Sequence, residues 1–445
     1  MRIAFSPPDI GDAEIEAVSE VLRSGWITTG PKTKAFEEAL ARYAGVSRAA
    51  CFSSATAALE CGLRLLGVGP GDEVITSAYT YTATASVIYH VGATPVLVDT
   101  APGSYDMDYG QLGQAITPRT KVIIPIDIAG VMCDYDTLYT VLEQHAGLFK
   151  PRAGTCQEYY GRPIVLADAA HSFGASYHGS PSGSVADFTA FSFHAVKNLT
   201  TGEGGALVWR SSIGTGDDTR ALLDDEAIYA RLMNLSLHGQ TKDALAKLMP
   251  GSWEYDIVEP AWKCNMTDIA AAIGLVQLER FPSLLDRRRE LLGLYEEALV
   301  EVGMMASAEI PAKLDIIDHA PQTGASSCHL LLTRLIGKDQ GFRDAMILAL
   351  GKRGIACNVH YKPLPLLTAY RERGFHSADF PNALAQFSNE LTLPLHTLLS
   401  NEDVRHIAEN LAEVYDECEA LGNKDVHHIA ENLADVHAEC ERLGE

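Results

Sequence analysis

Short apolar runs alternate with helical patterns between about residues 49 and 209. We expect strands over residues 49–53, 73–76, 94–99, 121–126, 164–168, 188–193 and 206–209, and helices over 55–66, 82–91 and 135–144. Strands that alternate with helices predict an α/β domain with a mainly parallel sheet. Ligands of such sheets bind beyond the carboxyl ends of the strands, so the residues that follow each strand are the candidates for chemistry.

The second half of the chain predicts a smaller domain. A helical pattern runs from Asp268 towards Leu299, with an expected interruption at Pro282. Beyond it we expect strands near residues 330–335 and 355–359 and a helix over 342–352, whereas the polar residues 148–161 indicate a loop insertion. The predicted domains are residues 1–280, 281–422 and a separate terminal helix over 423–445.

The end of the chain contains an internal repeat, because residues 403–412 recur as residues 425–434. In each copy the apolar residues recur at helical spacing. They are Val404, Ile407, Leu411, Val414, Cys418 and Leu421 in the first copy, and Val426, Ile429, Leu433, Val436, Cys440 and Leu443 in the second. We interpret the repeat as a duplicated terminal helix, with His427, His428 and His437 on a solvated face and not at a metal site.

Composition excludes several classes of protein. The 445 residues carry a formal net charge of −23, which argues against nucleic acid or an anionic membrane as a partner. The nine cysteines form no CxxC pair, so a disulfide framework or zinc site is not expected. There is no secretory signal pattern and no apolar run of membrane-spanning length, and we therefore expect a cytoplasmic protein.

Two polar residues follow apolar strands of the predicted sheet. Lys197 follows the strand over 188–193 in a glycine-rich turn, and Asp168 ends the strand over 164–168. A lysine amine at such a place can be held as an imine on a carbonyl cofactor, and a buried aspartate can pair with a pyridinium nitrogen. These are the two protein groups that pyridoxal phosphate (PLP) requires, and the pattern places both at one edge of the sheet.

Two further segments are candidates for holding such a cofactor. Residues 53–59, SSATAAL, join a strand to a helix, and a helix N-terminus with hydroxyl groups binds phosphate well, although Ser and Thr are also ordinary helix caps. Ser192, on the strand that leads to Lys197, could add a hydroxyl. In Tyr79-Thr80-Tyr81 an aromatic face could stack on a pyridine ring, with packing in the core as the alternative for Tyr79.

From about residue 5 to 422 the chain resembles the DegT/DnrJ/EryC1/StrS family of PLP-dependent sugar aminotransferases, which are similar to aspartate aminotransferase. The motifs that carry the resemblance are SGWITTGP at 24–31, SSATAAL at 53–59, GPGDEVI at 69–75, GATPV at 92–96, DAAHSFG at 168–174, SFHAVKNLTTGEGG at 192–205 and NMTDIAAAIG at 265–274. The resemblance implies PLP-transferase fold type I, with a large domain built on a mainly parallel sheet and a smaller α+β C-terminal domain.

The resemblance also implies roles for single residues. Lys197 would form the imine with PLP, and Asp168 would pair with the ring nitrogen. His171 would lie near the phenolic oxygen of the cofactor, and Tyr81 would stack on its ring. The residues expected to hold the phosphate are Ala55 through its backbone, Thr56, Ser192 and, from the neighbouring subunit of a homodimer, Asn265. The residues expected to line the substrate site are Thr28, Thr29, Gly30, His194, His329, His360 and Tyr361.

The implied activity is transfer of an amino group from L-glutamate to a nucleotide-linked keto sugar, at C4 of a UDP- or dTDP-4-keto sugar. A branch of the family that dehydrates keto sugars has histidine in place of the lysine, so Lys197 argues against it. Amination of a cyclitol ketone and a PLP-binding regulatory protein without turnover stay open. The chain departs from the family pattern at Ala55, Ser236 and Cys264, where glycine, a basic residue and an aromatic residue are usual.

Overall fold

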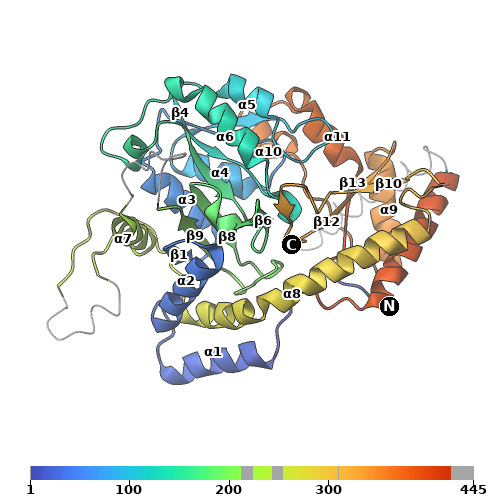
Figure 1. The fold of residues 1–445 in the computed structure, drawn as a ribbon, viewed down its shortest axis with the longest axis horizontal. Coiled ribbons are helices and arrows are strands. Elements are labelled where there is room, and N and C mark those ends of the chain that lie inside the picture. Colours follow the sequence, from blue (N-terminus) through green and yellow to red (C-terminus); the bar gives the residue numbers. More distant parts are fainter. Residues whose placement is uncertain (1, 212–223, 243–253, 309, 422–445) are drawn as a thin grey trace. The chain divides into compact units, whose positions relative to one another are not determined.

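The computed structural model describes residues 2–211, 224–242, 254–308 and 310–421 (Figure 1). The chain forms two compact units. The large unit contains Pro8–Leu285 and His319–His329, and the small unit contains the first seven residues, Asp286–Asp318 and the chain from Leu330 onward. The domain limits expected from the sequence stay predictions, and the terminal helix over 423–445 lies outside the described residues.

A seven-stranded sheet forms the centre of the large unit, in the order β1-β9-β8-β5-β4-β2-β3. Its strands are β1 (Ala49–Phe52), β2 (Glu73–Ser77), β3 (Thr94–Val98), β4 (Thr120–Ile124), β5 (Ile164–Asp168), β8 (Phe188–Ser192) and β9 (Gly205–Trp209). All pairings from β3 to β8 are parallel, and only β9 pairs antiparallel, with β8 and with β1. The prediction of a mainly parallel sheet is confirmed, each strand lying within about one or two residues of its expected place.

Helices and short strands surround this sheet in the large unit. The helices are α1 (Asp12–Ser24), α2 (Pro31–Ala44), α3 (Ala55–Leu65), α4 (Thr82–His90), α5 (Tyr109–Ala115), α6 (Tyr135–Gln144) and α7 (Asp225–Ser236), with η1 (Ile128–Gly130), η2 (Ala146–Leu148), η3 (Cys156–Tyr159) and η4 (Ser182–Ser184) as single 3₁₀ turns. The short strands are β6 (Ser176–Tyr177), β7 (Ser180–Pro181) and β11 (Gly324–Ala325), which form a small separate sheet. The predicted helices correspond to α3, α4 and α6.

Apolar side chains pack on both faces of the central sheet. On one face α3, α4 and α7 contribute residues such as Leu59, Val87 and Leu232 to a single buried cluster. On the other face α2 packs with residues such as Phe36, and a further cluster contains Leu138 from α6. Because both faces are covered, the strands are continuous apolar runs, as buried parallel strands usually are.

The predicted loop insertion over 148–161 is anchored on the large unit. It begins at the end of η2 and contains η3, and the buried Gln157 donates from Nε2 to the Leu66 carbonyl at 2.8 Å. Arg152 donates to Asp72 at 2.6 Å. Polar side chains therefore fix a segment that has little regular structure of its own.

Helix α8 (Asp268–Glu301) continues through Pro282, so the expected interruption at this residue is wrong. A proline inside a helix removes one backbone hydrogen bond and costs about 3 kcal/mol. The neighbouring Phe281, Leu284 and Leu285 are buried, and their burial offsets a cost of that size. The boundary between the two units falls within this helix, after Leu285.

The small unit combines a three-stranded antiparallel sheet with helices. The sheet has the order β10 (Leu314–Ile316), β12 (Leu331–Leu335), β13 (Glu390–Leu393), and the helical elements are α9 (Gln340–Lys352), η6 (Leu364–Leu366), α10 (Thr368–Arg371), η7 (Ser377–Asp379) and α11 (Pro381–Asn389). The expected strand near 330–335 is β12, and the helix expected over 342–352 is α9. The strand expected over 355–359 is wrong, because Ile355 and Asn358 form only isolated bridges, with Ile3 and Thr392.

Residues 401–421 form the last helix that the structure describes. Of the stripe predicted there, Val404, Ile407, Leu411, Val414 and Cys418 are buried, whereas Leu421 is exposed. The second copy of the stripe, with His427, His428 and His437, lies outside the described residues. Within the described ranges, no helix combines the length and apolar character needed to cross a bilayer.

Candidate active site

Lys197 lies in a turn just beyond the end of β8. Its backbone N–H donates to the His194 carbonyl at 2.9 Å, which closes the turn after Ser192, the last residue of β8. The side chain is half-buried. Loss of water around the amine lowers the pKa of Lys197 to about 8, and the negative charge of Asp168 opposes this shift.

Asp168 is the last residue of β5 and is only 7 % exposed. Its Oδ2 accepts a hydrogen bond from Thr84 Oγ1 at 2.7 Å, and its Oδ1 accepts one from the Ala170 N–H at 3.2 Å. Burial raises the pKa of Asp168, while these two hydrogen bonds and the charge of Lys197 act in the opposite direction. β5 and β8 are parallel neighbours, so Asp168 and Lys197 follow adjacent strands at the same edge of the sheet.

Thr84 is a site residue that the sequence reading missed. It is fully buried in the first turn of α4, and its hydroxyl lies 2.9 Å from that of Thr80. The Thr84 proton is directed at Asp168, so Thr80 is the donor to Thr84. Tyr81 caps the same helix and is 60 % exposed, whereas Tyr79 is buried, in agreement with the core alternative for that residue.

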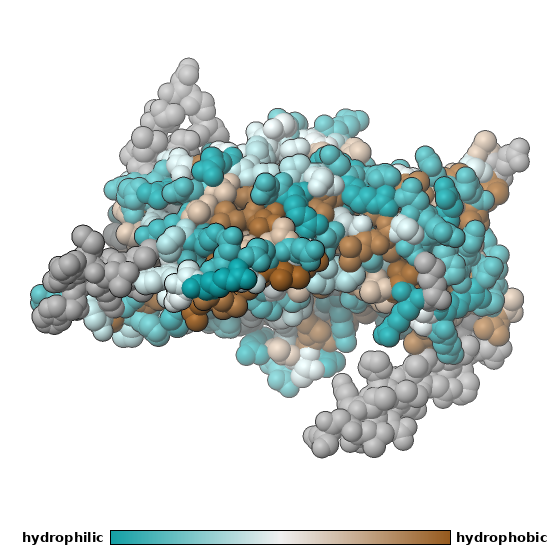
Figure 2. Space-filling view, turned by 90° about the horizontal axis from the view of Figure 1, so that it is seen from below, coloured by the Kyte–Doolittle hydropathy of each residue, from teal (hydrophilic) through white to brown (hydrophobic). Residues whose placement is uncertain are grey.

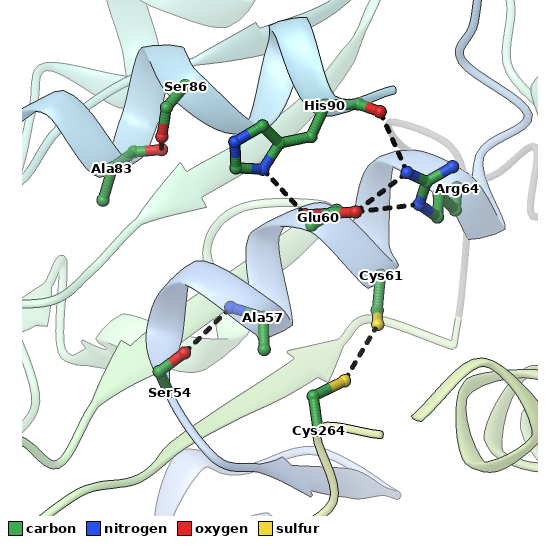
Figure 3. A network of polar contacts seen from close by, with 9 residues as sticks. All are labelled: Ser54, Ala57, Glu60, Cys61, Arg64, Ala83, Ser86, His90 and Cys264. Carbon is green, nitrogen blue, oxygen red and sulfur yellow. Dashed lines mark hydrogen bonds and ion pairs between the residues drawn. The ribbon is translucent and has the colours of Figure 1, made fainter. Parts of the chain in front are cut away.

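The N-terminus of α3 lies at the carboxyl end of β1 (Figure 3). Ser54 caps the helix by accepting a hydrogen bond from the Ala57 N–H at 3.1 Å. In the described part of the chain, the N–H groups of Ala55 and Thr56 donate to no protein acceptor. Two free amide groups at the positive end of a helix are suited to an anion such as phosphate.

Ser192 lies beside this helix terminus. In the β8–β9 ladder Ser192 is paired with Gly205, and a Cβ atom on Gly205 would lie 2.4 Å from the Ala55 nitrogen. The backbone of β9 and the start of α3 are therefore in direct contact. A side chain at position 205 would prevent this contact. Three of the predicted phosphate ligands, Ala55, Thr56 and Ser192, thus lie close together.

Helix α3 is held from both sides by polar contacts (Figure 3). Glu60 accepts from Arg64 at 2.8 Å and lies 2.9 Å from His90 Nδ1, which joins α3 to α4. On the opposite side, the sulfur of Cys61 lies 4.0 Å from that of Cys264, the residue before Asn265. These contacts fix the orientation of the helix whose N-terminus is the phosphate candidate.

Asn265 and the segment of Thr28–Gly30 form a connected group. Asn265 donates to the Thr29 hydroxyl, which donates to the Met266 carbonyl at 2.5 Å. Gly30 is the N-cap residue of α2, and a Cβ atom there would lie 2.0 Å from Trp26 Nε1, so any larger residue would displace the Trp26 side chain. Thr28 accepts from the Asp268 N–H at 3.1 Å. The structure thus brings Thr28, Thr29, Gly30 and Asn265 together.

The histidines predicted for the site occupy different surroundings. His171 and His329 are buried, and their rings are neighbours with centroids 4.5 Å apart. His194 is exposed, and its Nε2 lies 3.7 Å from Glu203 Oε1. His360 and Tyr361 belong to the small unit, where the His360 N–H donates to Glu390 at 2.8 Å; their role stays a prediction.

The residues of the large unit fit PLP. The hydrogen-bond donors to the buried Asp168 carboxylate, the Thr84 hydroxyl and the Ala170 N–H, are both neutral, and a pyridinium N–H would supply a cationic donor to the same group. The amine of Lys197 can react with the aldehyde of PLP. The free amide groups of Ala55 and Thr56 can bind its phosphate. The described chain contains no group of three or more His, Cys, Asp or Glu side chains placed for a metal ion.

A mainly parallel sheet with this lysine and this carboxylate at its carboxyl edge defines the class, a PLP-dependent transferase of fold type I. The model of the DegT/DnrJ/EryC1/StrS aminotransferase family matches residues 8–412, so the chain belongs to that family. The protein is therefore an aminotransferase, and its cofactor is PLP.

Two solved structures and one curated relative illustrate the similarity. The putative sugar aminotransferase Spr1654 from Streptococcus pneumoniae, in its PMP form, is 52 % identical with a TM-score of 0.87, over 94 % of this chain and 100 % of that one. PseC from Helicobacter pylori, an aminotransferase involved in the biosynthesis of pseudoaminic acid, is 26 % identical with a TM-score of 0.77, over 94 % and 100 % of the two chains. The spore coat polysaccharide biosynthesis protein SpsC from Bacillus subtilis is 37 % identical over 93 % of this chain and 97 % of its own.

Proposed function

We propose that this aminotransferase moves an amino group from L-glutamate to C4 of a UDP- or dTDP-linked 4-keto sugar. The observation that carries the proposal is that Lys197 and Asp168 both lie at the same edge of the sheet, after adjacent parallel strands. A sugar acceptor is supported by similarity to the putative sugar aminotransferase Spr1654 and to PseC, an aminotransferase involved in the biosynthesis of pseudoaminic acid. The motif around Lys197, residues 192–205, supports amination at C4, because it resembles the motif of family members that aminate this position.

The lowered pKa of Lys197 makes its amine suitable for moving a proton. With a pKa of about 8, roughly a tenth of the amine is uncharged at pH 7. An ordinary lysine amine, with a pKa of about 10.4, is uncharged in only about one molecule in 2,500. Partial burial therefore increases the fraction of competent base by a factor of hundreds.

When bound, PLP supplies the electron sink that stabilises negative charge on the carbon next to the amino group. Lys197 would link to the cofactor and, once displaced by the amino donor, would move the proton at that carbon. Asp168 would hold a proton on the ring nitrogen, and a cationic N–H in front of its carboxylate would lower the pKa of Asp168 again. The N–H groups of Ala55 and Thr56 with the hydroxyl of Ser192 would hold the phosphate.

The proposed active unit is a cytoplasmic homodimer in which Asn265 reaches the phosphate of the neighbouring subunit. The exposed apolar side chains of the large unit support a partner surface of this kind, because contiguous exposed apolar patches are typical of protein–protein interaction sites. They include Ile10, Ile15, Leu22, Ile27, Tyr255, Ile257, Val258 and Trp262. Figure 2 shows hydrophobic side chains among hydrophilic ones on the side of the molecule where α1 lies in Figure 1.

The test is a two-stage reaction with purified, PLP-loaded protein. L-Glutamate is added first, and the visible absorbance of the cofactor should fall as 2-oxoglutarate appears. A panel of UDP- and dTDP-linked 4-keto sugars is added next, and NMR of the product should show an amino group at C4. Recovery of the original absorbance with the same sugar completes the cycle.

The other outcomes separate the alternatives. Turnover of keto-inositols, with none of nucleotide sugars, would replace the proposal by cyclitol amination. An absorbance that glutamate and other amino donors leave unchanged would indicate a PLP-binding regulator. Size measurement of the loaded protein tests the dimer separately, and a monomer with full activity would contradict the shared site.

A further inference from the structure

Two buried imidazoles lie side by side, and one of them contacts Asn198, the residue after Lys197. The rings of His171 and His329 have centroids 4.5 Å apart and planes inclined by 49°. His171 is 6 % exposed and His329 is 2 % exposed. Two positive charges this close and this far from water would be costly, so both rings are expected to be neutral. The position of the single proton on each ring then follows from its hydrogen-bond partners.

Asn198 determines the tautomer of His329. The Asn198 Nδ2 donates to the Ser327 carbonyl at 2.7 Å, and a carbonyl oxygen can only accept. The amide oxygen Oδ1 must therefore face His329 Nδ1, at 2.8 Å. Because an amide oxygen also only accepts, the proton of His329 lies on Nδ1, and Nε2 carries the lone pair.

The backbone determines the opposite tautomer of His171. The Ala129 N–H donates to His171 Nδ1 at 3.2 Å, and a backbone N–H can only donate. Nδ1 of His171 therefore carries the lone pair, and its proton lies on Nε2. His171 is thus an N–H donor at Nε2, as a partner of a phenolate oxygen must be.

Further hydrogen bonds connect these residues into one group. The Ala129 carbonyl accepts from the His329 N–H at 3.0 Å, so Ala129 contacts both histidines through its backbone. Ser327 Oγ donates to the His171 carbonyl at 2.5 Å. Apart from the two rings, the titratable side chains on the four segments 127–130, 168–171, 194–198 and 326–329 are Asp127, Asp168, His194, Lys197 and Cys328.

We propose that Asn198 is a positioning residue that acts through His329 to keep His171 in place as a neutral Nε2–H donor to the phenolic oxygen of PLP. The proposal rests on the PLP site proposed above, and deepens it by giving His329 a supporting role behind His171. Asn198 directly follows Lys197, so the same turn carries the lysine and the group that fixes the donor.

The first experiment measures the tautomers in PLP-loaded protein labelled with ¹⁵N-histidine, without amino donor or sugar. Long-range ¹H–¹⁵N spectra should show the His329 proton on Nδ1 and the His171 proton on Nε2, with signals assigned from His171→Gln and His329→Gln. A His171 proton on Nδ1 would overturn the proposal. Since no substrate is used, this result does not depend on the identity of the sugar.

The second experiment follows the visible absorbance of bound PLP against pH in Asn198→Leu. A phenolate that loses its donor becomes more basic, so the apparent pKa of the bound cofactor should rise by about 0.5–1 pH unit. Thr189→Val is the control, because the buried Thr189 hydroxyl has no hydrogen-bond partner to lose among the residues that the structure describes. If Asn198→Leu binds PLP and the apparent pKa of the bound cofactor is unchanged, the proposal is overturned. If this variant does not bind PLP, the positions of the His171 and His329 protons in the unmodified protein decide whether the proposal holds.

Discussion

Thr84 donates a hydrogen bond to Asp168 at 2.7 Å, and this contact connects the first turn of α4 to the end of β5. The Thr80 hydroxyl lies 2.9 Å from the Thr84 hydroxyl, so two hydrogen-bonded hydroxyl groups lead to the carboxylate of Asp168. The chain fixes the orientation of a buried anion and favours its ionised form, which is the form that a protonated ring nitrogen requires.

Thr84→Val should weaken PLP binding. The substitution keeps the shape of the side chain but removes one donor from the carboxylate, and a hydrogen bond to a charged group contributes about 1.5–3 kcal/mol. The pKa of Asp168 should therefore rise further, and the dissociation constant of PLP should increase about tenfold or more. Titration of the apo protein with PLP, followed by absorbance, measures the change.

The matched control for Thr84→Val is Thr189→Val, in β8 of the same unit. Thr189 is also fully buried, but its hydroxyl makes no hydrogen bond among the described residues, so its loss should leave the affinity for PLP unchanged. Equal affinities in the two variants would show that Thr84 does not support Asp168.

Gly205→Ala should disrupt the phosphate site. A Cβ atom at this position would lie 2.4 Å from the Ala55 nitrogen, and backbone atoms cannot yield as the end of a flexible side chain can. We expect a loss of about 1–3 kcal/mol in the free energy of unfolding, as for overpacked cores, together with weaker PLP binding. Chemical denaturation and PLP titration measure the two effects.

Gly161→Ala serves as the comparison for Gly205→Ala, because, apart from its chain neighbours, a Cβ atom on Gly161 would meet no atom of the described chain within 4 Å. It should behave like the unmodified protein in both measurements. If Gly205→Ala also bound PLP with normal affinity, the close approach of β9 and α3 would have no part in holding the phosphate.

Lys197→Arg should abolish both half-reactions. A guanidinium group is permanently charged and forms no imine, whereas the position and charge of the side chain are largely kept. Stopped-flow absorbance with glutamate, followed by product analysis with the keto sugar, measures each half separately. Transamination at the normal rate in this variant would remove Lys197 from the proposed chemistry.

Glu390 should give the small unit a stability that depends on pH. Its carboxylate is buried and accepts hydrogen bonds from Thr392 at 2.5 Å and from the His360 N–H at 2.8 Å, and burial raises the pKa of Glu390 to about 8. An exposed glutamate has a pKa of about 4.3. Between these values the folded state binds more protons, so stability contributed by Glu390 falls as the pH rises from about 4.5 to 8.

Glu390→Gln removes this titration. The melting temperature of Glu390→Gln should therefore rise relative to that of the unmodified protein as the pH is raised from 5 to 9. Glu409→Gln, on the exposed face of the helix over 401–421, is the control for the substitution itself. If the difference in melting temperature between Glu390→Gln and the unmodified protein does not change between pH 5 and 9, the Glu390 carboxyl group is ionised in the folded protein over this whole range.

The sequence was sufficient to predict the elements that carry the chemistry. Asp168 and Lys197 follow continuous apolar runs, and the parallel order of such strands places their ends at one edge. The contacts made by Thr84 and Asn198 could not be predicted, because they depend on the rotation of α4 and on the turn after Lys197. One signal was present, since Asn198 is a polar residue directly beside the candidate lysine.

The errors elsewhere have physical causes. Pro282 was expected to interrupt its helix, but the burial of neighbours such as Phe281 outweighs the loss of one hydrogen bond. The apolar residues 355–359 predicted a strand, yet β13, the neighbour of β12, comes from residues 390–393 much later in the chain. Local pattern does not specify which distant segment pairs with a strand.

The most direct test of the central claim is reduction of the PLP-loaded protein with borohydride, followed by proteolysis and mass spectrometry. The account predicts that the phosphopyridoxyl group is found on the peptide that contains Lys197, and that Lys197→Arg yields no labelled peptide. A label on another lysine, or no label on a protein that binds PLP and is active, would contradict the assignment.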